Sequence, residues 1–268
     1  MTFEVNGFDV SKWQGKIDWK ILGTKGDFYI IRAGSIDNIT GKCYEDYQFH
    51  RNAQLGMTFG KPMGAYWYFR PQFSGIIQAD YFSKLVEPYK FQIKASLDGE
   101  ETGTDSNGNS LSSNQVTSAA WVFMNRLKRN LGDGMIYTSP GFWSFTTSWA
   151  YEYDLWNAQW PNDETVTEPD IPLDWSSRGK KALFWQHKVG THGQELGFDR
   201  GCHGVDTNRF MGTREEFEQL YYGGVIPPDV VIPTPEPTPI PQKIATYADG
   251  SLLMKWKDRK YFKKNRRR

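Results

Sequence analysis

Four acidic residues stand where the sequence predicts the ends of β-strands. Asp9 closes a first apolar run, Asp98 and Glu100 close a later one, and Asp206 lies near the end of the folded part. In a parallel β/α barrel such ends meet at one rim, so the four carboxyl groups would share one site. One carboxyl group can protonate a leaving oxygen while others stabilise a developing positive charge. The pattern predicts a pocket for cleaving a glycosidic bond.

Asp98 and Glu100 are two residues apart, so on an extended strand their side chains share a face. Their Cα atoms would lie about 7 Å apart, a spacing compatible with glycosidases that use no enzyme nucleophile. Glu101 would point the opposite way and have a structural role. A lone aspartate at such a place is more often a helix cap or a loop acid. Four at the same rim favour a site.

The elements that must position these acids alternate between short β-rich runs and helical patterns. The predicted strands are Val5–Val10, Phe28–Ala33, Met63–Phe69, Ile93–Asp98, Met135–Thr138, Asp154–Gln159, Ala182–His187 and Val205–Asn208. The predicted helices are Tyr44–Leu55, Ile76–Pro88, Ser113–Leu131 and Arg214–Tyr221. This order predicts an α/β fold, an irregular TIM-like β/α barrel with a reduced helix complement in its second half.

The barrel is expected to occupy residues 1–224. A proline-rich linker follows at 225–242, where seven of the fourteen prolines lie, and proline favours an extended polyproline II spacer. A basic tail, 243–268, is too small to bury a core alone. The net charge of +1 hides an asymmetry, because the tail carries a balance of about +8 and the rest about −7.

Only Cys43 and Cys202 are present, which fits neither a disulfide framework nor a zinc site. Two free thiols are the main expectation, with pairing as the alternative. The first residues show no secretory signal and no apolar run is long enough to span a bilayer. We therefore expect synthesis in the cytoplasm and no membrane partner. No nucleic-acid partner is expected either, because nothing in the barrel sequence supports that role.

Several segments resemble the family 25 glycoside hydrolases, the lysozymes of the Chalaropsis type. The resemblance covers residues 1 to about 222 in consistent order. Its motifs include Gly7–Trp19, Phe28–Gly34, Gly64–Phe69, Leu97–Glu100, Ile136–Pro140, Leu155–Trp160, Phe184–Gln186 and Val205–Phe210. It implies hydrolysis, in bacterial peptidoglycan, of the β-1,4 bond between N-acetylmuramic acid and N-acetylglucosamine.

The same resemblance implies a role for each acid. Glu100 matches the general acid, and Asp98 matches the partner that polarises the N-acetyl group or stabilises the oxocarbenium-like charge. Asp9 and Asp206 match two further acids of the site. Neighbouring negative charge would raise the pKa of Glu100 and keep it protonated. Neither a cofactor nor a metal is expected, and retention or inversion of configuration stays open.

Aromatic residues near strand ends are candidates for sugar binding, although core packing is at least as common a role for each. They are Tyr66, Tyr68, Tyr137, Trp160 and Trp185. The sequence departs from the family pattern at Gly99, where an aliphatic residue is usual, and at Trp67, where a histidine is common. A polar insertion, Thr102–Ser113, could form one wall of the cleft. The histidines are expected in loops or on the surface: His50, His187, His192 and His203.

The leading interpretation is a peptidoglycan muramidase, specifically a phage endolysin that accumulates in the host cytoplasm and reaches the wall after release. The alternatives are a catalytically inactive module that binds cell-wall glycan, and a chitinase-like barrel. The latter would need a longer acidic run on the fourth strand. The basic tail is either a solvated terminus or a tether to anionic wall polymers.

Overall fold

The computed structural model describes residues 5–144, 146–161, 165–191, 194–198 and 204–223, and three short strands between residues 242 and 263. The chain divides into two compact units, Met1–Val230 and Val231–Arg268. The division falls inside the predicted proline-rich linker. Within these described ranges, no helix is long and apolar enough to cross a membrane.

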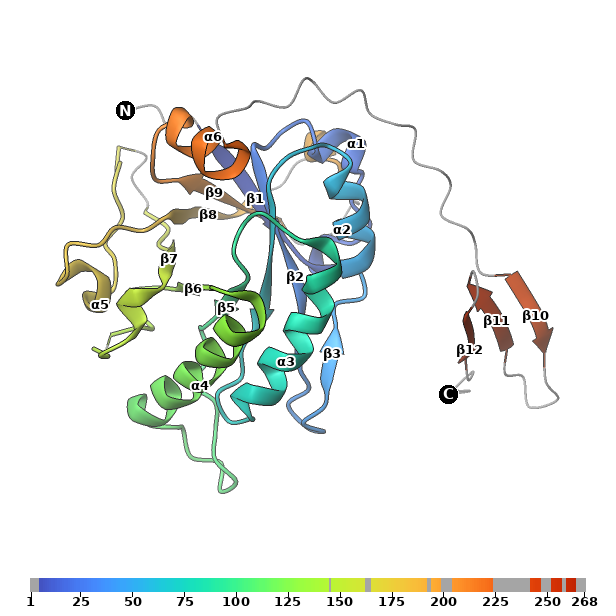
Figure 1. The fold of residues 1–268 in the computed structure, drawn as a ribbon, viewed down its shortest axis with the longest axis horizontal. Helices are drawn as coiled ribbons and strands as arrows, with labels where there is room; N and C mark the ends of the chain where they lie inside the picture. The colour runs from blue at the N-terminus through green and yellow to red at the C-terminus, as the bar shows by residue number, and fades with distance from the viewer. Residues whose placement is uncertain are drawn as a thin grey trace. The chain divides into compact units, whose positions relative to one another are not determined.

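Eight strands close into a barrel in the first unit (Figure 1). They are β1 (Asn6–Val10), β2 (Phe28–Ile36), β4 (Met63–Tyr68), β5 (Ser96–Asp98), β6 (Met135–Thr138), β7 (Asp154–Ala158), β8 (Phe184–Thr191) and β9 (Val205–Phe210). The barrel closes because β1 pairs with β2 on one side and with β9 on the other. All eight predicted strands are present, and β5 begins at Ser96 rather than at Ile93.

The last strand departs from the parallel pattern. The barrel pairings from β1 and β2 through β8 are parallel, but β9 pairs antiparallel with both β8 and β1. An antiparallel neighbour needs no helical crossover. The amino-terminal end of β9 therefore lies at the rim formed by the carboxyl ends of the other strands.

The predicted helix Tyr44–Leu55 was wrong at its beginning. Residues Cys43–Glu45 form β3, which pairs antiparallel with the end of β2, and α2 runs from Phe49 to Met57. Asp46 separates the two elements, because its carboxylate accepts hydrogen bonds from the backbone N–H groups of Lys12 and Gln48, each at 2.9 Å. The bond from Gln48, two residues along the chain, is a local side-chain bond of the kind that favours a turn over a continuing helix.

The two longest helices, α3 (Gly75–Val86) and α4 (Ser113–Leu131), both belong to the first half of the barrel. In Figure 1, α2, α3 and α4 lie along one side of it. α4 has the predicted bounds and begins with a capping box between Ser112 and Gln115. In the second half, α6 (Arg214–Tyr222) has nine residues, as α2 has, and α5 (Leu173–Ser176) has four, as α1 (Trp19–Leu22) has in the first half. 3-10 turns lie at Lys12–Gln14, Glu87–Tyr89, Ala150–Glu152 and Gln194–Leu196. The predicted reduction of helices in the second half is confirmed.

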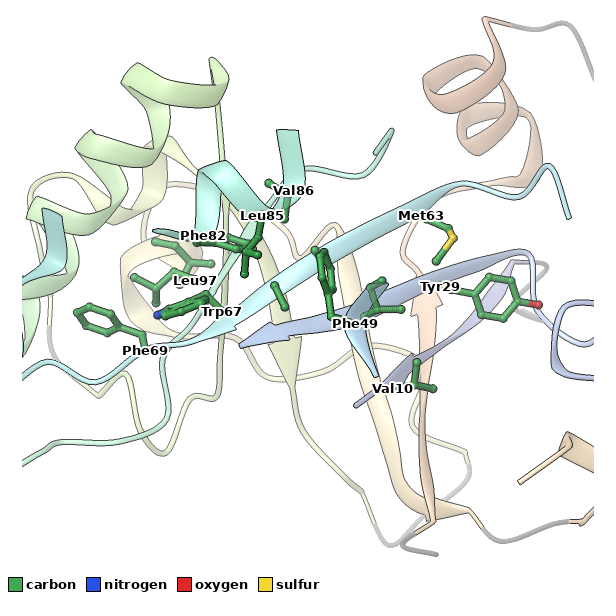
Figure 2. Packing of buried hydrophobic residues seen from close by; sticks show 14 of the residues in the cluster. Val10, Tyr29, Phe49, Met63, Trp67, Phe69, Phe82, Leu85, Val86 and Leu97 are labelled. Atoms are coloured by element: carbon green, nitrogen blue, oxygen red, sulfur yellow. The ribbon is translucent and has the colours of Figure 1, made fainter. Parts of the chain in front are cut away.

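Successive side chains of a strand point to opposite faces of the barrel wall, so residues of odd and even position (their parity) contribute to two different cores. The outer core includes Tyr29, Met63, Trp67 and Leu97 from the strands, packed with helix residues such as Phe82 (Figure 2). The inner core contains the residues of opposite parity, namely Phe28, Ile30, Met135, Trp156, Phe184 and Phe210. Some polar residues lie close to the rim and have the same parity as the residues of the inner core. Their side chains therefore face the mouth of the barrel.

The second unit contains three antiparallel strands: β10 (Gln242–Thr246), β11 (Leu252–Trp256) and β12 (Arg259–Lys263). The backbone pairing places all three strands in one small sheet. Whether the basic tail is a solvated terminus or a tether stays a prediction.

Candidate active site

The four predicted acids come together at one rim of the barrel. Asp9 lies on β1, Asp98 ends β5, and Glu100 follows two residues later. Asp206 is the second residue of β9 rather than a residue near a strand's carboxyl end. Because β9 is reversed, Asp206 still reaches this rim, where it is the cross-strand partner of Asp9.

These acids line a cleft of about 660 Å³. Its lining residues are Asp9, Val10, Ser11, Trp13, Gln14, Arg32, Tyr66, Tyr68, Asp98, Glu100, Val189, Gly190, Gly204 and Asp206. Arg32 is the only cation in this set from the described part of the chain. No residue of the insertion Thr102–Ser113 is among them, so the insertion does not form a wall of this cleft.

Asp9 is buried and strongly hydrogen-bonded. Its Oδ2 accepts bonds from Gln186 Nε2 at 2.9 Å and from Asn208 Nδ2 at 2.7 Å. Removal from water and the charge of Asp206 raise the pKa of Asp9 well above its usual range, while the two amides act to lower it. Asp9 is therefore held in one orientation, and it ionises reluctantly.

Asp98 is equally buried but lacks such support. Its Oδ1 is enclosed and has no hydrogen-bond partner among the described residues. Burial, followed by the charge of Glu100, raises its pKa well above the usual range, and the guanidinium of Arg32 opposes this rise. A buried carboxylate without hydrogen bonds is costly, which makes Asp98 a strained feature of the site.

Glu100 is open to the cleft, yet its pKa is raised. The largest cause is the partial removal of water by the cleft walls; Asp206 and Glu101 also raise the pKa, and Arg32 lowers it. The predicted direction is confirmed, although lost hydration contributes more than neighbouring charge. As predicted, Glu101 is structural: its carboxylate pairs with Arg70 at 2.6 Å.

Asp206 is half-buried and accepts a bond from the backbone N–H of Gly190 at 3.0 Å. Burial raises its pKa as well. All four acids of the cleft therefore have raised pKa values. A site of this kind retains protons at a pH where free carboxylic acids have lost them.

Arg32 was not singled out from the sequence. It lies on β2 with the parity of Phe28 and Ile30, and its guanidinium stands 5.0 Å from the ring centre of Tyr68. A terminal nitrogen of Arg32 donates to the hydroxyl of Tyr44 at 3.4 Å. The parity of β2 could have identified Arg32 as a residue facing the mouth of the barrel.

The predicted sugar-binding aromatics occupy four different positions. Tyr66 and Tyr68 line the cleft. Tyr137 is buried beneath it and donates to Gln186 Oε1 at 2.9 Å. Trp160 is 51% exposed and donates to the same oxygen at 3.1 Å, which places it at the rim. Trp185 is fully buried, and its N–H bonds to the carbonyl of Gln159, so the structure does not support a sugar-stacking role for it.

Trp13 is a lining residue that the sequence did not distinguish from core tryptophans. Its indole is 53% exposed, and Lys12 Nζ lies 5.0 Å from its ring centre. A short 3-10 turn, Lys12–Gln14, projects it over the cleft. Two exposed indoles, Trp13 and Trp160, are thus available to stack on a sugar ring.

The departures from the family pattern lie away from the cleft. Trp67 is fully buried in the outer core and donates to Gln78 Oε1 at 3.1 Å. A Cβ on Gly99 would approach Leu97 to 3.0 Å and would face Trp143 rather than the cleft. Both residues serve packing, and neither alters the row of acids.

The remaining candidates give no second cluster. His50 bonds to Tyr89 and Glu45, and burial lowers the pKa of His187 to about 4. Within the described ranges, no group of three His, Cys, Asp or Glu residues could hold a metal ion. Cys43 is a half-buried free thiol, in agreement with the main expectation, whereas Cys202, His192 and His203 lie outside the described residues.

A closed β/α barrel with two neighbouring carboxyl groups at its rim is an arrangement compatible with a glycoside hydrolase. The sequence model of glycosyl hydrolases family 25 matches residues 8–194, and the chain belongs to this family.

Three relatives illustrate the similarity. Lysozyme M1 of Streptomyces globisporus is 31% identical over 79% of this chain and 69% of its own length. The uncharacterised protein YegX of Escherichia coli K12 is 30% identical over 83% of this chain and 75% of its own length. The crystal structure of the lysozyme from Streptomyces coelicolor superposes with a TM-score of 0.65 at 27% identity, covering 84% of this chain and all of the other.

Proposed function

We propose that this glycoside hydrolase is an N-acetylmuramidase, a lysozyme that hydrolyses the β-1,4 bond between N-acetylmuramic acid and N-acetylglucosamine in bacterial peptidoglycan. The observation that carries the proposal is Glu100, a carboxyl group open to the cleft with a raised pKa and with Asp98 beside it. The similarity to lysozymes supports the same conclusion.

Glu100 is the proton donor to the leaving glycosidic oxygen. Asp98 stabilises the positive charge at the anomeric carbon, or polarises the N-acetyl group of the substrate. The two carboxyl groups interact and titrate as a pair, so one proton remains on the pair when most free carboxyl groups are ionised. Because Glu100 faces the cleft and Asp98 is enclosed, the transferable proton belongs on Glu100 when substrate is bound.

Arg32 supplies positive charge that opposes the rise in the pKa of Asp98 and Glu100. Its role is to keep one carboxylate of the pair ionised while the other holds the proton. Asp9 and Asp206 act by orienting the substrate and by tuning the pKa of Glu100. Tyr66, Tyr68, Trp13 and Trp160 form the sugar-binding walls.

The second candidate is a catalytically inactive module that binds wall glycan. The barrel retains all four acids in one cleft, which favours the enzyme. The decrease in turbidity of a cell-wall suspension separates the two, because an inactive module leaves the suspension turbid.

Mass spectrometry of the products from purified peptidoglycan tests the proposed bond. A new reducing end on muramic acid is the expected result. A new reducing end on glucosamine would identify a glucosaminidase and reject the proposal.

We further propose that the enzyme is a phage endolysin that acts on the wall after release from the host cytoplasm, with its basic tail contacting anionic wall polymers. Expression inside a bacterium with and without a pore-forming protein tests the first part. Lysis only with the pore is expected, and lysis without it contradicts this route.

A further inference from the structure

Two amide side chains converge on one oxygen of Asp9. Gln186 on β8 and Asn208 on β9 are 2% and 0% exposed, and they are cross-strand partners. Both donate to Asp9 Oδ2, at 2.9 Å and 2.7 Å. None of the described residues makes a hydrogen bond to Asp9 Oδ1, although Asp9 lines the cleft.

The orientation of each amide is fixed by groups behind it. Trp156 Nε1 donates to Asn208 Oδ1 at 2.7 Å, and an indole N–H can only donate. Asn208 must therefore turn its NH₂ group toward Asp9.

Gln186 is fixed in the same way. Its Oε1 accepts bonds from the Tyr137 hydroxyl at 2.9 Å and from the Trp160 indole at 3.1 Å. Its NH₂ group is thereby directed at Asp9. If either amide group were turned by 180°, the buried groups that now donate to its oxygen would face an NH₂ group and lose their acceptor, which is costly.

This arrangement has a chemical consequence for Asp9. Since Oδ2 receives two N–H donors, it must act as an acceptor, and Oδ1 is left for the cleft. In the ionised form of Asp9, a lone pair of Oδ1 is thereby available to the cleft, and in the protonated form Oδ1 carries the proton.

We propose that Gln186 and Asn208 are positioning residues of the active site, which hold Asp9 so that Oδ1 forms a hydrogen bond with a substrate hydroxyl group or with water. Trp160 connects this network to the exposed rim, because one indole both reaches the solvent and bonds to Gln186. The inference rests on the proposed muramidase function.

A double-mutant cycle with Asp9 tests the proposal on soluble peptidoglycan fragments. Gln186→Met keeps the size and removes both polar groups. We expect kcat to fall about tenfold with KM changed by less than about twofold, because orientation at the reacting centre is lost. In an Asp9→Asn background the same change should alter kcat by less than about twofold, because Gln186 acts through Asp9.

The matched control is Gln78→Met. Gln78 is also fully buried and also accepts from an indole N–H, that of Trp67, but it lies in the outer core. Its replacement should lower the melting temperature and leave kcat of the folded protein unchanged. Should Gln186→Met fail to fold, Tyr137→Phe removes one hydroxyl group from the same network and should lower kcat in the same direction.

Equal losses for Gln186→Met in the wild-type and Asp9→Asn backgrounds would overturn the positioning role while leaving the muramidase function intact. Unchanged kcat in a folded Gln186→Met variant would do the same. A wild-type protein that releases no fragment from peptidoglycan would overturn both this inference and the proposed function.

Discussion

The two sides of the cleft hold their carboxyl groups in different ways. On the side built from β1, β8 and β9, Asp9 accepts hydrogen bonds from two side-chain amides, and Asp206 accepts one from a backbone N–H group. On the side built from β2, β4 and β5, Asp98 has an enclosed oxygen with no hydrogen-bond partner among the described residues, and the charge of Arg32 takes the place of hydrogen bonds. The first side is arranged to hold an acid still. The second is arranged to keep a proton on one of two acids.

Asp98→Asn should show this contrast most strongly. Loss of charge next to the reacting carbon should lower kcat by about 10² or more. The same change should raise stability by about 1 kcal/mol at neutral pH, because an unsupported buried carboxylate is removed, and Tm should rise by about 2–4 °C. Calorimetry and fragment assays on the purified variant measure both effects.

The gain in stability expected for Asp98→Asn should depend on pH. The pKa of Asp98 is raised in the folded state, so its ionisation costs stability as pH rises above the unfolded value. Wild type and Asp98→Asn should therefore converge in stability below about pH 4, where the aspartate is protonated in both states. Asp9→Asn should gain less, because its carboxylate is already hydrogen-bonded. An equal gain for Asp9→Asn would remove the proposed difference between the sides.

Arg32→Met should lower kcat about tenfold, an order-of-magnitude expectation for a lost charge at a general acid–base site. Since Arg32 lowers the pKa of Glu100, its loss raises that pKa further, and the alkaline limb of the pH–rate profile should move to higher pH. Arg32→Lys should restore most of the wild-type profile. Arg126, which pairs with Asp80 between α4 and α3, provides the control, since Arg126→Met should leave the profile in place. A profile unmoved by Arg32→Met would contradict the role of the cation.

The tryptophans should separate by exposure. Trp13→Ala and Trp160→Ala remove exposed stacking surfaces, and KM for soluble fragments should rise about 3- to 10-fold, equivalent to about 0.5–1.5 kcal/mol. Trp185→Phe should instead lower Tm and leave KM unchanged, because its indole is buried. A rise in KM for Trp185→Phe alone would restore the original sugar-binding prediction for that residue.

Deletion of residues 243–268 should have the smallest effect. If the tail tethers the enzyme electrostatically, wall binding should weaken mainly at low salt, because such attraction is screened beyond about 10 Å at 0.1 M ionic strength. Cleavage of soluble fragments should not change. Equal binding of both forms to cell walls across a salt series would leave the tail without a tethering role.

Much of this architecture could be predicted, because the alternation of apolar and polar residues indicates the strands and the residues that follow each apolar run indicate where the strands end. The eight strands and the helix Ser113–Leu131 follow from periodicity and capping. The direction of β9 could not be predicted, since the connection from Thr191 to Val205 is long enough for either a crossover or a reversal. That reversal also explains why Asp206 reaches the rim from the beginning of its strand.

The residues missed from the site depend on tertiary contacts. Gln186 and Asn208 resemble ordinary buried amides until their common bond to Asp9 is seen. Trp185 was wrongly predicted to bind sugar, although its parity is opposite to that of the inward-facing Phe184 and Gln186. Counting parity within each strand would have excluded Trp185 and identified Arg32.

Replacement of Glu100 with glutamine tests most directly whether Glu100 is the proton donor. Glu100→Gln preserves the shape of the side chain and removes the transferable proton, so lysis of purified walls should fall by about 10² or more while Tm stays the same. Glu168→Gln is the matched control, because Glu168 forms an exposed ion pair with Lys181 outside the cleft, and it should lyse walls at the wild-type rate. Near-normal lysis by a correctly folded Glu100→Gln variant would contradict the assignment of Glu100 as the proton donor.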